Sequence, residues 1–331
     1  MPTNLPPDYY TVEKRYQAAT DPSEKAELLE EMLSKIPKHK GTDHLRADLR
    51  RKLSRLKASG GSKKGASRQG SAYNISKEGA GQIVVIGPSN VGKSALVASN
   101  TNASPEVSEV PFSTWGPTPG MMVIENIQVQ LIDTPPLNLE HIEADLFNLM
   151  RKADLLLIMV DLQADPEQQL EETLSILKDH RIIPAHLADP ADGELARRYF
   201  LKPCLVLANK CDDAQGDENF EIFRQLLESE CPMMPISVQV TRNIETLKQA
   251  IYQKLGIMRV YSQAPGEQAK MHLPFVMPIG STVEEFAAKV HQDFAKNMKS
   301  ARVWGPSAAF EGQTVSREHI LQEGDIVELN M

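Results

Sequence analysis

The chain has few cysteines, few aromatic residues and no long hydrophobic stretch. Its 331 residues include three cysteines, and aromatic residues make up 5%. Cys204, Cys211 and Cys231 show neither paired nor metal-ligand spacing, so a disulfide framework is not expected. No apolar run approaches the roughly 18 residues of a membrane-spanning helix, and the N-terminus lacks an apolar signal core. These absences predict a soluble, cytoplasmic protein with no membrane partner.

Acidic residues are scarce in residues 35–77, although the whole chain carries a net charge of −8. This stretch holds thirteen lysines and arginines against Asp43 and Asp48. Residues 43–57 have helical spacing, with leucines on one stripe and basic side chains around it. The leucines are Leu45, Leu49, Leu53 and Leu56, and the basic residues are Arg46, Arg50, Arg51, Lys52 and Arg55.

An earlier helix is predicted over residues 23–36, where Leu28, Leu29 and Met32 supply a packing surface. The sequence therefore predicts a helical hairpin within residues 1–58, followed by a flexible basic linker over residues 59–78. The basic side chains form either a solvated face or a surface for the phosphate backbone of RNA. Aromatic residues are absent between Tyr16 and Tyr73, so base stacking and sequence-specific readout by this arm are not expected.

The segment GPSNVGKS, residues 87–94, has the pattern of a phosphate-binding loop. Glycines allow close approach of backbone N–H groups to phosphates, Lys93 reaches the β and γ oxygens, and the Ser94 hydroxyl ligates Mg²⁺. A buried strand is predicted before the loop, at residues 82–86, and a helix after it, whose N-terminus favours anions. The nucleotide-binding candidates here are Gly87, Pro88, Ser89, Asn90, Val91, Gly92, Lys93 and Ser94.

A second motif, NKCD at residues 209–212, follows the apolar run 201–208 and predicts which base is bound. In an open α/β sheet, ligands bind beyond the carboxyl ends of the strands, where this motif falls. The Asp212 carboxylate can accept hydrogen bonds from the guanine N1–H and 2-amino groups, which adenine cannot match. Asn209 can hold the loop and the purine edge. With Lys210, these residues favour GTP and GDP over adenine nucleotides.

With these motifs in view, the chain resembles GTPases of the Obg and developmentally regulated GTP-binding protein (DRG) branch, and DRG more closely. The matching segments are residues 37–42, 77–82 and 111–120, and, for a C-terminal TGS domain, residues 280–291 and 303–305. The resemblance implies an α/β fold. A basic helical hairpin precedes a doubly wound P-loop GTPase domain over residues 79–257, and a β-grasp TGS domain follows over residues 258–331. It also assigns Ser237 and Val238 to the last guanine-binding loop.

The same resemblance locates the two switch segments and the metal. Thr114 lies twenty residues after Ser94, where Obg-like proteins supply the second Mg²⁺ hydroxyl, and Thr118 is a rival in the same segment. Asp133 occupies the place of a carboxylate that holds Mg²⁺ through water. The expected metal site is therefore Ser94, Thr114 and Asp133, and the expected catalytic residues are Lys93 and Thr114.

Residues 136 and 137 depart from the superfamily pattern. Pro136 stands where a glycine N–H normally binds the γ-phosphate, and proline has no N–H. Leu137 cannot orient an attacking water as glutamine does, so slow hydrolysis is expected, below roughly 0.1 per second. Asn90 resembles an asparagine of potassium-activated GTPases and has two interpretations: a K⁺ ligand, or a residue that accepts left-handed backbone geometry.

Three functions remain open from the sequence. The favoured one is a slow, Mg²⁺-dependent GTPase switch acting on RNA or ribosomes, with a regulatory protein as a further expected partner. The others are a guanine-nucleotide sensor that does not hydrolyse GTP and an RNA-binding adaptor. In the TGS-like region a helix is predicted over residues 282–296, and its apolar stripe predicts core packing. The stripe consists of Val283, Phe286, Val290 and Phe294.

Overall fold

The computed structural model describes most of residues 72–330 and a few positions before them. The described ranges are 72–102, 116–139, 142–188, 197–227, 231–264, 271 and 273–330, together with Val12, Tyr16, Leu28, Leu29, Glu31, Met32, Leu33, Lys35 and Leu49. The chain divides into two compact units, Met1–Ser71 and Ala72–Met331. No described helix combines the length and hydrophobicity that crossing a bilayer requires.

The described residues of the first unit are helical, and the hydrophobic ones among them form a small core. Leu28, Leu29, Met32 and Leu49 are buried together with Val12. The residues that the sequence predicted as the inner face of two helices thus pack against one another, as a helical hairpin requires. Leu45, Leu53 and Leu56 lie outside the described residues.

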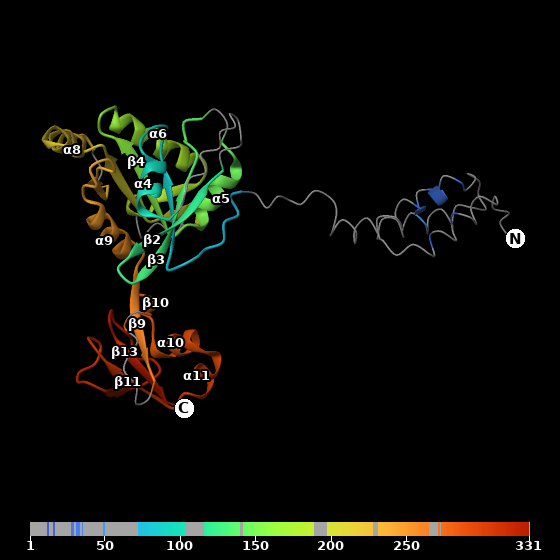
Figure 1. The fold of residues 1–331 in the computed structure, drawn as a ribbon, viewed down its shortest axis with the longest axis vertical. Helices are drawn as coiled ribbons and strands as arrows, with labels where there is room; N and C mark the ends of the chain where they lie inside the picture. The colour runs from blue at the N-terminus through green and yellow to red at the C-terminus, as the bar shows by residue number, and fades with distance from the viewer. Residues whose placement is uncertain are drawn as a thin grey trace. The chain divides into compact units, whose positions relative to one another are not determined.

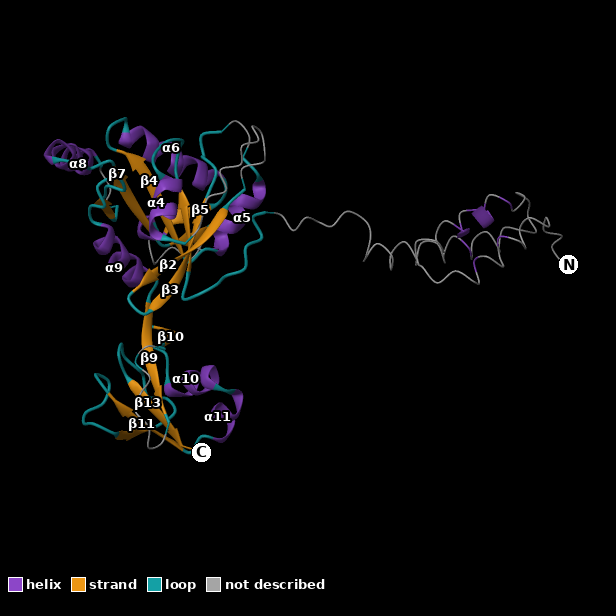
Figure 2. Cartoon of the chain, in the orientation of Figure 1, coloured by secondary structure: helices purple, strands orange, loops and turns teal. Residues whose placement is uncertain are grey.

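The second unit begins with a six-stranded sheet in the order β2-β3-β1-β4-β7-β8 (Figures 1 and 2). Only β2 is antiparallel to its neighbour. Every residue of β1, β4 and β7 is buried, as expected for parallel strands covered on both faces. The bounds are β1 Gln82–Ile86, β2 Thr118–Ile124, β3 Ile127–Asp133, β4 Leu155–Asp161, β7 Cys204–Asn209 and β8 Met233–Pro235.

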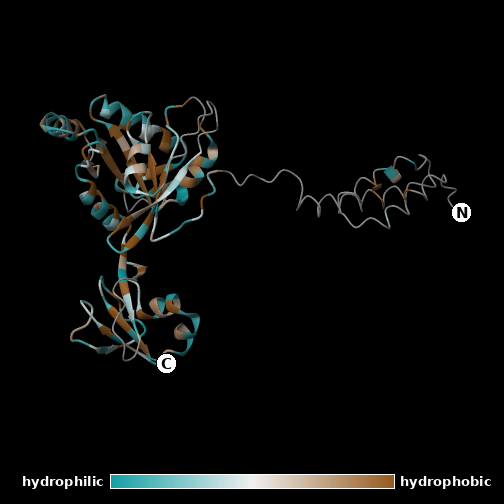
Figure 3. Ribbon diagram, viewed as in Figure 1, coloured by the Kyte–Doolittle hydropathy of each residue, from teal (hydrophilic) through white to brown (hydrophobic). Residues whose placement is uncertain are grey.

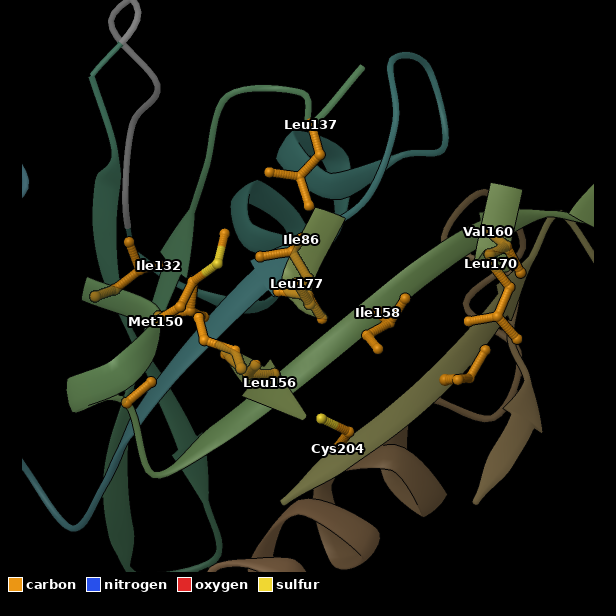
Figure 4. Packing of buried hydrophobic residues seen from close by; sticks show 14 of the residues in the cluster. Ile86, Ile132, Leu137, Met150, Leu156, Ile158, Val160, Leu170, Leu177 and Cys204 are labelled. Atoms are coloured by element: carbon orange, nitrogen blue, oxygen red, sulfur yellow. The ribbon is translucent and has the colours of Figure 1, made fainter. Parts of the chain in front are cut away.

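Helices cover both faces of this sheet because successive side chains of each strand point to opposite sides. Val84 and Leu156 belong to a core completed by residues of α5, α6 and α8, part of which is drawn in Figure 4. Ile83 and Leu157 belong to the other core, completed by α4 and α9. The helices are α4 Lys93–Asn100, α5 Ala144–Lys152, α6 Pro166–Asp179, α8 Ala214–Leu226 and α9 Ile244–Lys254. This is the predicted doubly wound arrangement, and Figure 3 shows its strands as largely hydrophobic.

The apolar run 201–208 forms two strands rather than one. Pro203 has no N–H to give to a ladder and separates β6, Phe200–Lys202, from β7. Strand β6 pairs in parallel with β5, Ile182–Pro184, which precedes a short 3₁₀ helix, Ala185–Leu187. Strand β7 alone joins the main sheet and carries the base motif at its carboxyl end.

The C-terminal part has the predicted β-grasp form, a five-stranded sheet in the order β10-β9-β13-β11-β12 packed against helices. Val283 and Phe286 are buried, and Val290 and Phe294 are partly buried against them, so the predicted stripe is core. The elements are β9 Ile257–Gln263, β10 Phe275–Pro278, α10 Val283–Val290, α11 Gln292–Asn297, β11 Ser300–Trp304, β12 Gln313–Val315 and β13 Ile326–Asn330.

The helix predicted over residues 282–296 is wrong in one respect, because two helices occupy this range. Thr282 and Glu285 form a capping box at the start of α10. His291 has an extended backbone, with φ −167°, which ends α10. Its ring Nδ1 accepts a hydrogen bond from the Asp293 N–H at 3.2 Å and so caps α11. His291 is therefore the point where the predicted helix breaks.

Candidate nucleotide-binding site

The loop between β1 and α4 requires glycine at two positions. Gly87 has φ 144°, and a Cβ there would lie 2.4 Å from the Met159 carbonyl oxygen. Gly92 has φ 100°, and a Cβ there would lie 2.4 Å from Asn209 Nδ2. Helix α4 then begins without a side-chain cap, which leaves its first N–H groups for a ligand. The loop thus has the geometry of an anion site.

Lys93 is folded back onto this loop. Its buried Nζ donates to the carbonyl oxygens of Gly87 and Pro88, at 3.1 Å and 2.6 Å. Burial lowers the pKa of Lys93 to about 8, and the negative charge of Asp133 opposes that shift. The Lys93 ammonium group is therefore held in a poorly hydrated position at the loop, where an anionic ligand would strongly favour its charged form.

Ser94 and Asp133 meet beside the lysine. The Ser94 hydroxyl donates to Asp133 Oδ2 at 2.6 Å. Asp133 Oδ1 is buried and has no hydrogen-bond partner among the described residues. Burial raises the pKa of this carboxyl, while Ser94 and Lys93 act to lower it. A hydroxyl and an incompletely satisfied carboxylate are hard oxygen donors of the kind that Mg²⁺ prefers, so these residues fit that ion.

Of the two candidate switch threonines, one lies among the described residues. Thr118 begins β2 and pairs in register with Asp133. Thr114 lies outside the described residues, so its metal and catalytic assignments stay predictions. The RNA-contact candidates lie outside the described residues as well; they are Arg46, Arg50, Arg51, Lys52 and Arg55.

On the base side, Asn209 connects three loops. Its Nδ2 donates to the Val91 carbonyl oxygen at 2.8 Å, and its Oδ1 accepts from the Val238 N–H at 3.2 Å. The side chain is buried. Of the two roles predicted for Asn209, holding the loop is the one these bonds perform. The phosphate loop, the NKCD motif and the last guanine-binding loop are consequently fixed to one another.

Asp212, in the same motif, has hydrogen-bond partners from two other loops. One carboxylate oxygen accepts from the Ser237 hydroxyl, and the other accepts from Gln163 Nε2 at 3.4 Å. The Ser237 oxygen in turn accepts from the Val240 N–H at 3.1 Å. Ser237, which the resemblance assigned to the last guanine-binding loop, thus contacts the carboxylate that is predicted to bind the base.

Lys210 has a partner that sequence reasoning missed. Its Nζ donates to Asp161 Oδ2, and Lys210 itself has a left-handed backbone with φ 66°. Asp161 ends β4, beside β7, which carries the base motif. Its position directly after a continuous apolar run, residues 155–160, was the signal that could have identified it.

The second switch borders the phosphate loop. A pocket of about 670 Å³ is lined by the loop, the start of α4, Pro136 and Leu139. The Leu137 N–H donates to the Gly87 carbonyl oxygen at 3.1 Å. Its side chain is 2% exposed, belongs to the core, and points toward Ile86 in Figure 4. Leu137 therefore does not face a position from which it could contact water in the pocket.

Two asparagines lie at this side of the site. Asn90 is exposed and has φ 62°, the left-handed geometry that one of its two interpretations requires; the K⁺ interpretation stays a prediction. Asn138 was not among the predicted site residues. Its Oδ1 accepts from both the Ser89 N–H, at 3.1 Å, and the Ser89 hydroxyl, at 2.9 Å. The sequence feature that could have identified Asn138 is its polar side chain two positions after Pro136, which departs from the superfamily pattern.

Comparisons with known proteins agree with this geometry. A family model described as a 50S ribosome-binding GTPase matches residues 82–188, and a TGS domain model matches residues 258–331. A GTP-binding protein of Methanocaldococcus jannaschii is 28% identical, with 92% of this chain and 91% of the relative covered. Developmentally-regulated G-protein 2 of Arabidopsis thaliana is 25% identical, with 92% and 90% covered.

One solved structure adds support for the fold alone. The YchF GTPase of Schizosaccharomyces pombe aligns with a TM-score of 0.54 at 12% identity, with 77% of this chain and 99% of that chain covered. Together, the phosphate loop, the base motif and the sheet define a P-loop GTP-binding protein. More narrowly, the chain is similar over 92% of its length to GTP-binding proteins that include a developmentally regulated G-protein, and its C-terminal residues match a TGS domain.

Proposed function

We propose that the protein is a slow GTPase switch that engages RNA or ribosomes in its GTP-bound form. The observation that carries the proposal is the bridge made by Asn209 between the phosphate loop and the loops around Asp212. One side chain fixes the distance between a phosphate pocket and a guanine-specific carboxylate, which is the requirement for binding a whole guanine nucleotide.

The proposed reaction is in-line attack of water on the γ-phosphate. Lys93 stabilises negative charge on the phosphates, and the N–H groups at the start of α4 bind phosphate oxygens. Bound Mg²⁺, held by Ser94 and by Asp133 through water, would neutralise charge on the phosphates as the bond breaks. Thr114 is the proposed second hydroxyl ligand.

The expected rate is low because no glutamine follows the second switch motif. Leu137 takes that position and its side chain is in the core. Without a side chain there to orient water, we expect turnover below roughly 0.1 per second, in the range of unaided GTPases. Potassium held by Asn90 would raise this rate.

The test is GTP hydrolysis by the full chain in KCl and in NaCl, compared with the Lys93→Ala variant. We expect slow turnover that the variant loses, because it lacks the cation that the phosphates require. Faster turnover in K⁺ would support Asn90 as a ligand, and equal rates would remove that role. Tight GTP binding with no turnover above the variant would instead favour the nucleotide sensor, a reading that Pro136 motivates.

RNA binding separates the switch from the adaptor. The basic residues of the N-terminal arm supply the proposed contact to the RNA backbone, with salt-dependent affinity. A switch binds RNA or ribosomes differently with GTP and with GDP, whereas an adaptor ignores the nucleotide. Replacing Arg50, Arg51 and Arg55 together by alanine should weaken binding in either case, so the nucleotide dependence is the discriminating result.

A further inference from the structure

A single side chain joins the second switch to the phosphate loop. Asn138 Oδ1 accepts two hydrogen bonds from Ser89, one from its N–H and one from its hydroxyl. A backbone N–H can only donate, so the carboxamide must turn its oxygen toward Ser89 and its nitrogen away. The orientation of this exposed side chain is therefore set by the loop that binds phosphate.

The three residues before Asn138 have no free backbone N–H group that could donate to an anion. Pro135 and Pro136 have no N–H, and the Leu137 N–H already donates to the Gly87 carbonyl oxygen. Three consecutive positions of the second switch thus lack a free donor. In GTPases this segment is ordered by contact with the γ-phosphate, so a donor from another source is required if the switch is to respond to GTP.

The Asn138 carboxamide is placed to supply that donor. Asn138 lies between Pro136 and Leu139, both of which line the phosphate pocket. Its Nδ2 carries two N–H groups, and neither has a partner among the described residues. A primary amide beside a phosphate loop is a neutral donor that suits a phosphate oxygen.

Building on the proposed GTP binding, we propose that Asn138 donates a hydrogen bond to the γ-phosphate and thereby distinguishes GTP from GDP. The side chain replaces the backbone amide that Pro136 eliminates, and Ser89 holds it in position. GDP has no γ-phosphate, so its affinity does not depend on Asn138.

The experiment measures affinities of the full chain for GDP and for a non-hydrolysable GTP analogue by calorimetry, with Mg²⁺ present. For Asn138→Ala we expect a loss of about tenfold or more for the analogue and an unchanged GDP affinity, since a hydrogen bond to a charged group is lost. For Asn138→Asp we expect a still larger loss, because a carboxylate has no donor and repels the phosphate. Asn219→Ala on α8 is the matched control and should change neither affinity.

The aspartate variant decides between recognition and simple bracing. Its carboxylate can still accept both hydrogen bonds from Ser89, so a bracing role would survive the change. Wild-type affinity of Asn138→Asp for the analogue would overturn the proposal, as would equal losses for GDP and the analogue in Asn138→Ala. If the wild-type chain bound neither nucleotide, both the proposed function and this inference would be wrong. Normal nucleotide binding that the Asn138 variants leave unchanged is a different result, and it would contradict this inference alone.

Discussion

The two ends of the nucleotide site differ in how completely the protein satisfies its own polar groups. On the base side, Asn209 has partners at both ends of its amide, and Asp212 and Lys210 are each bonded to a neighbouring side chain. On the phosphate side, burial lowers the pKa of Lys93 to about 8 and raises that of Asp133. Asp133 also keeps a buried oxygen without a partner among the described residues.

This contrast separates selection of the base from sensing of the phosphates. Preformed hydrogen bonds hold the guanine-side groups in one geometry, so they can discriminate without rearranging. The phosphate-side charges are desolvated and incompletely paired, so an anion and its metal ion gain more from entering there. We therefore expect base specificity to depend on single fixed contacts, and affinity and switching to depend on charge.

The largest expected effect comes from breaking the base side at Asp212. Replacing it with alanine removes the carboxylate that we propose accepts hydrogen bonds from guanine, and so leaves the ligand's donors unpaired. Preference for GDP over ADP should fall by about 100-fold or more, since sites built on such hydrogen bonds discriminate strongly. Competition binding of the two nucleotides measures this ratio.

Asp213→Ala is the neighbouring control for that prediction. The Asp213 side chain caps α8 by accepting from the Gly216 N–H, so its loss should cost about 1 kcal/mol of stability and leave base preference intact. An unchanged GDP-to-ADP ratio in Asp212→Ala would show that guanine is selected elsewhere.

The next effect concerns the phosphate side and pH. Because Lys93 in the free protein has a pKa lowered to about 8, GDP affinity should fall as pH rises above that value, by up to about tenfold per pH unit. The ligand's phosphates are already ionised there, with a second pKa of about 6. Affinities measured from pH 7 to pH 10 give the profile.

Stability of the free protein should move in the opposite direction over the same interval. An unfolded chain holds the Lys93 proton up to the usual pKa of 10.5, whereas the folded chain releases it near 8. Between these values the unfolded state binds more protons, so the Lys93 contribution to stability rises with pH. A Lys93→Met variant should lose both trends, and a wild-type affinity that stays flat through pH 9 would contradict the charged role.

The contrast between the base side and the phosphate side also bears on which parts of the fold and of the site could be predicted from the sequence. The phosphate loop at residues 87–94 was predictable because close backbone approach restricts which residues fit, and the position of residues 209–212 at the end of a strand followed from the apolar run before them. The buried strands followed from continuous apolar runs. Asp161 and Asn138 were missed because their roles are contacts across 49 residues of chain, with Lys210 and Ser89 respectively. No local pattern encodes such a pairing.

Local errors had local causes as well. Pro203 divides the apolar run 201–208 between two strands, and His291 ends a helix whose apolar stripe continues beyond it. Hydrophobic periodicity shows which side of a helix or strand is buried. It does not show a break in that element when the same side is buried before and after the break. The β-grasp core was therefore predicted correctly while its helix was drawn too long.

The smallest expected effect sharpens the comparison within the base side. Lys210→Met keeps much of the side chain's length but breaks the ion pair with Asp161, leaving Asp161 Oδ2 without that donor. We expect GDP and the GTP analogue to lose affinity equally, by about threefold to tenfold, because the pair supports the base loop and does not contact the γ-phosphate. Calorimetry with both nucleotides measures the two losses, and Lys248→Met on α9 is the control. An unequal loss would mean that the guanine loop also responds to the γ-phosphate, and the separation between base selection and phosphate sensing would then fail.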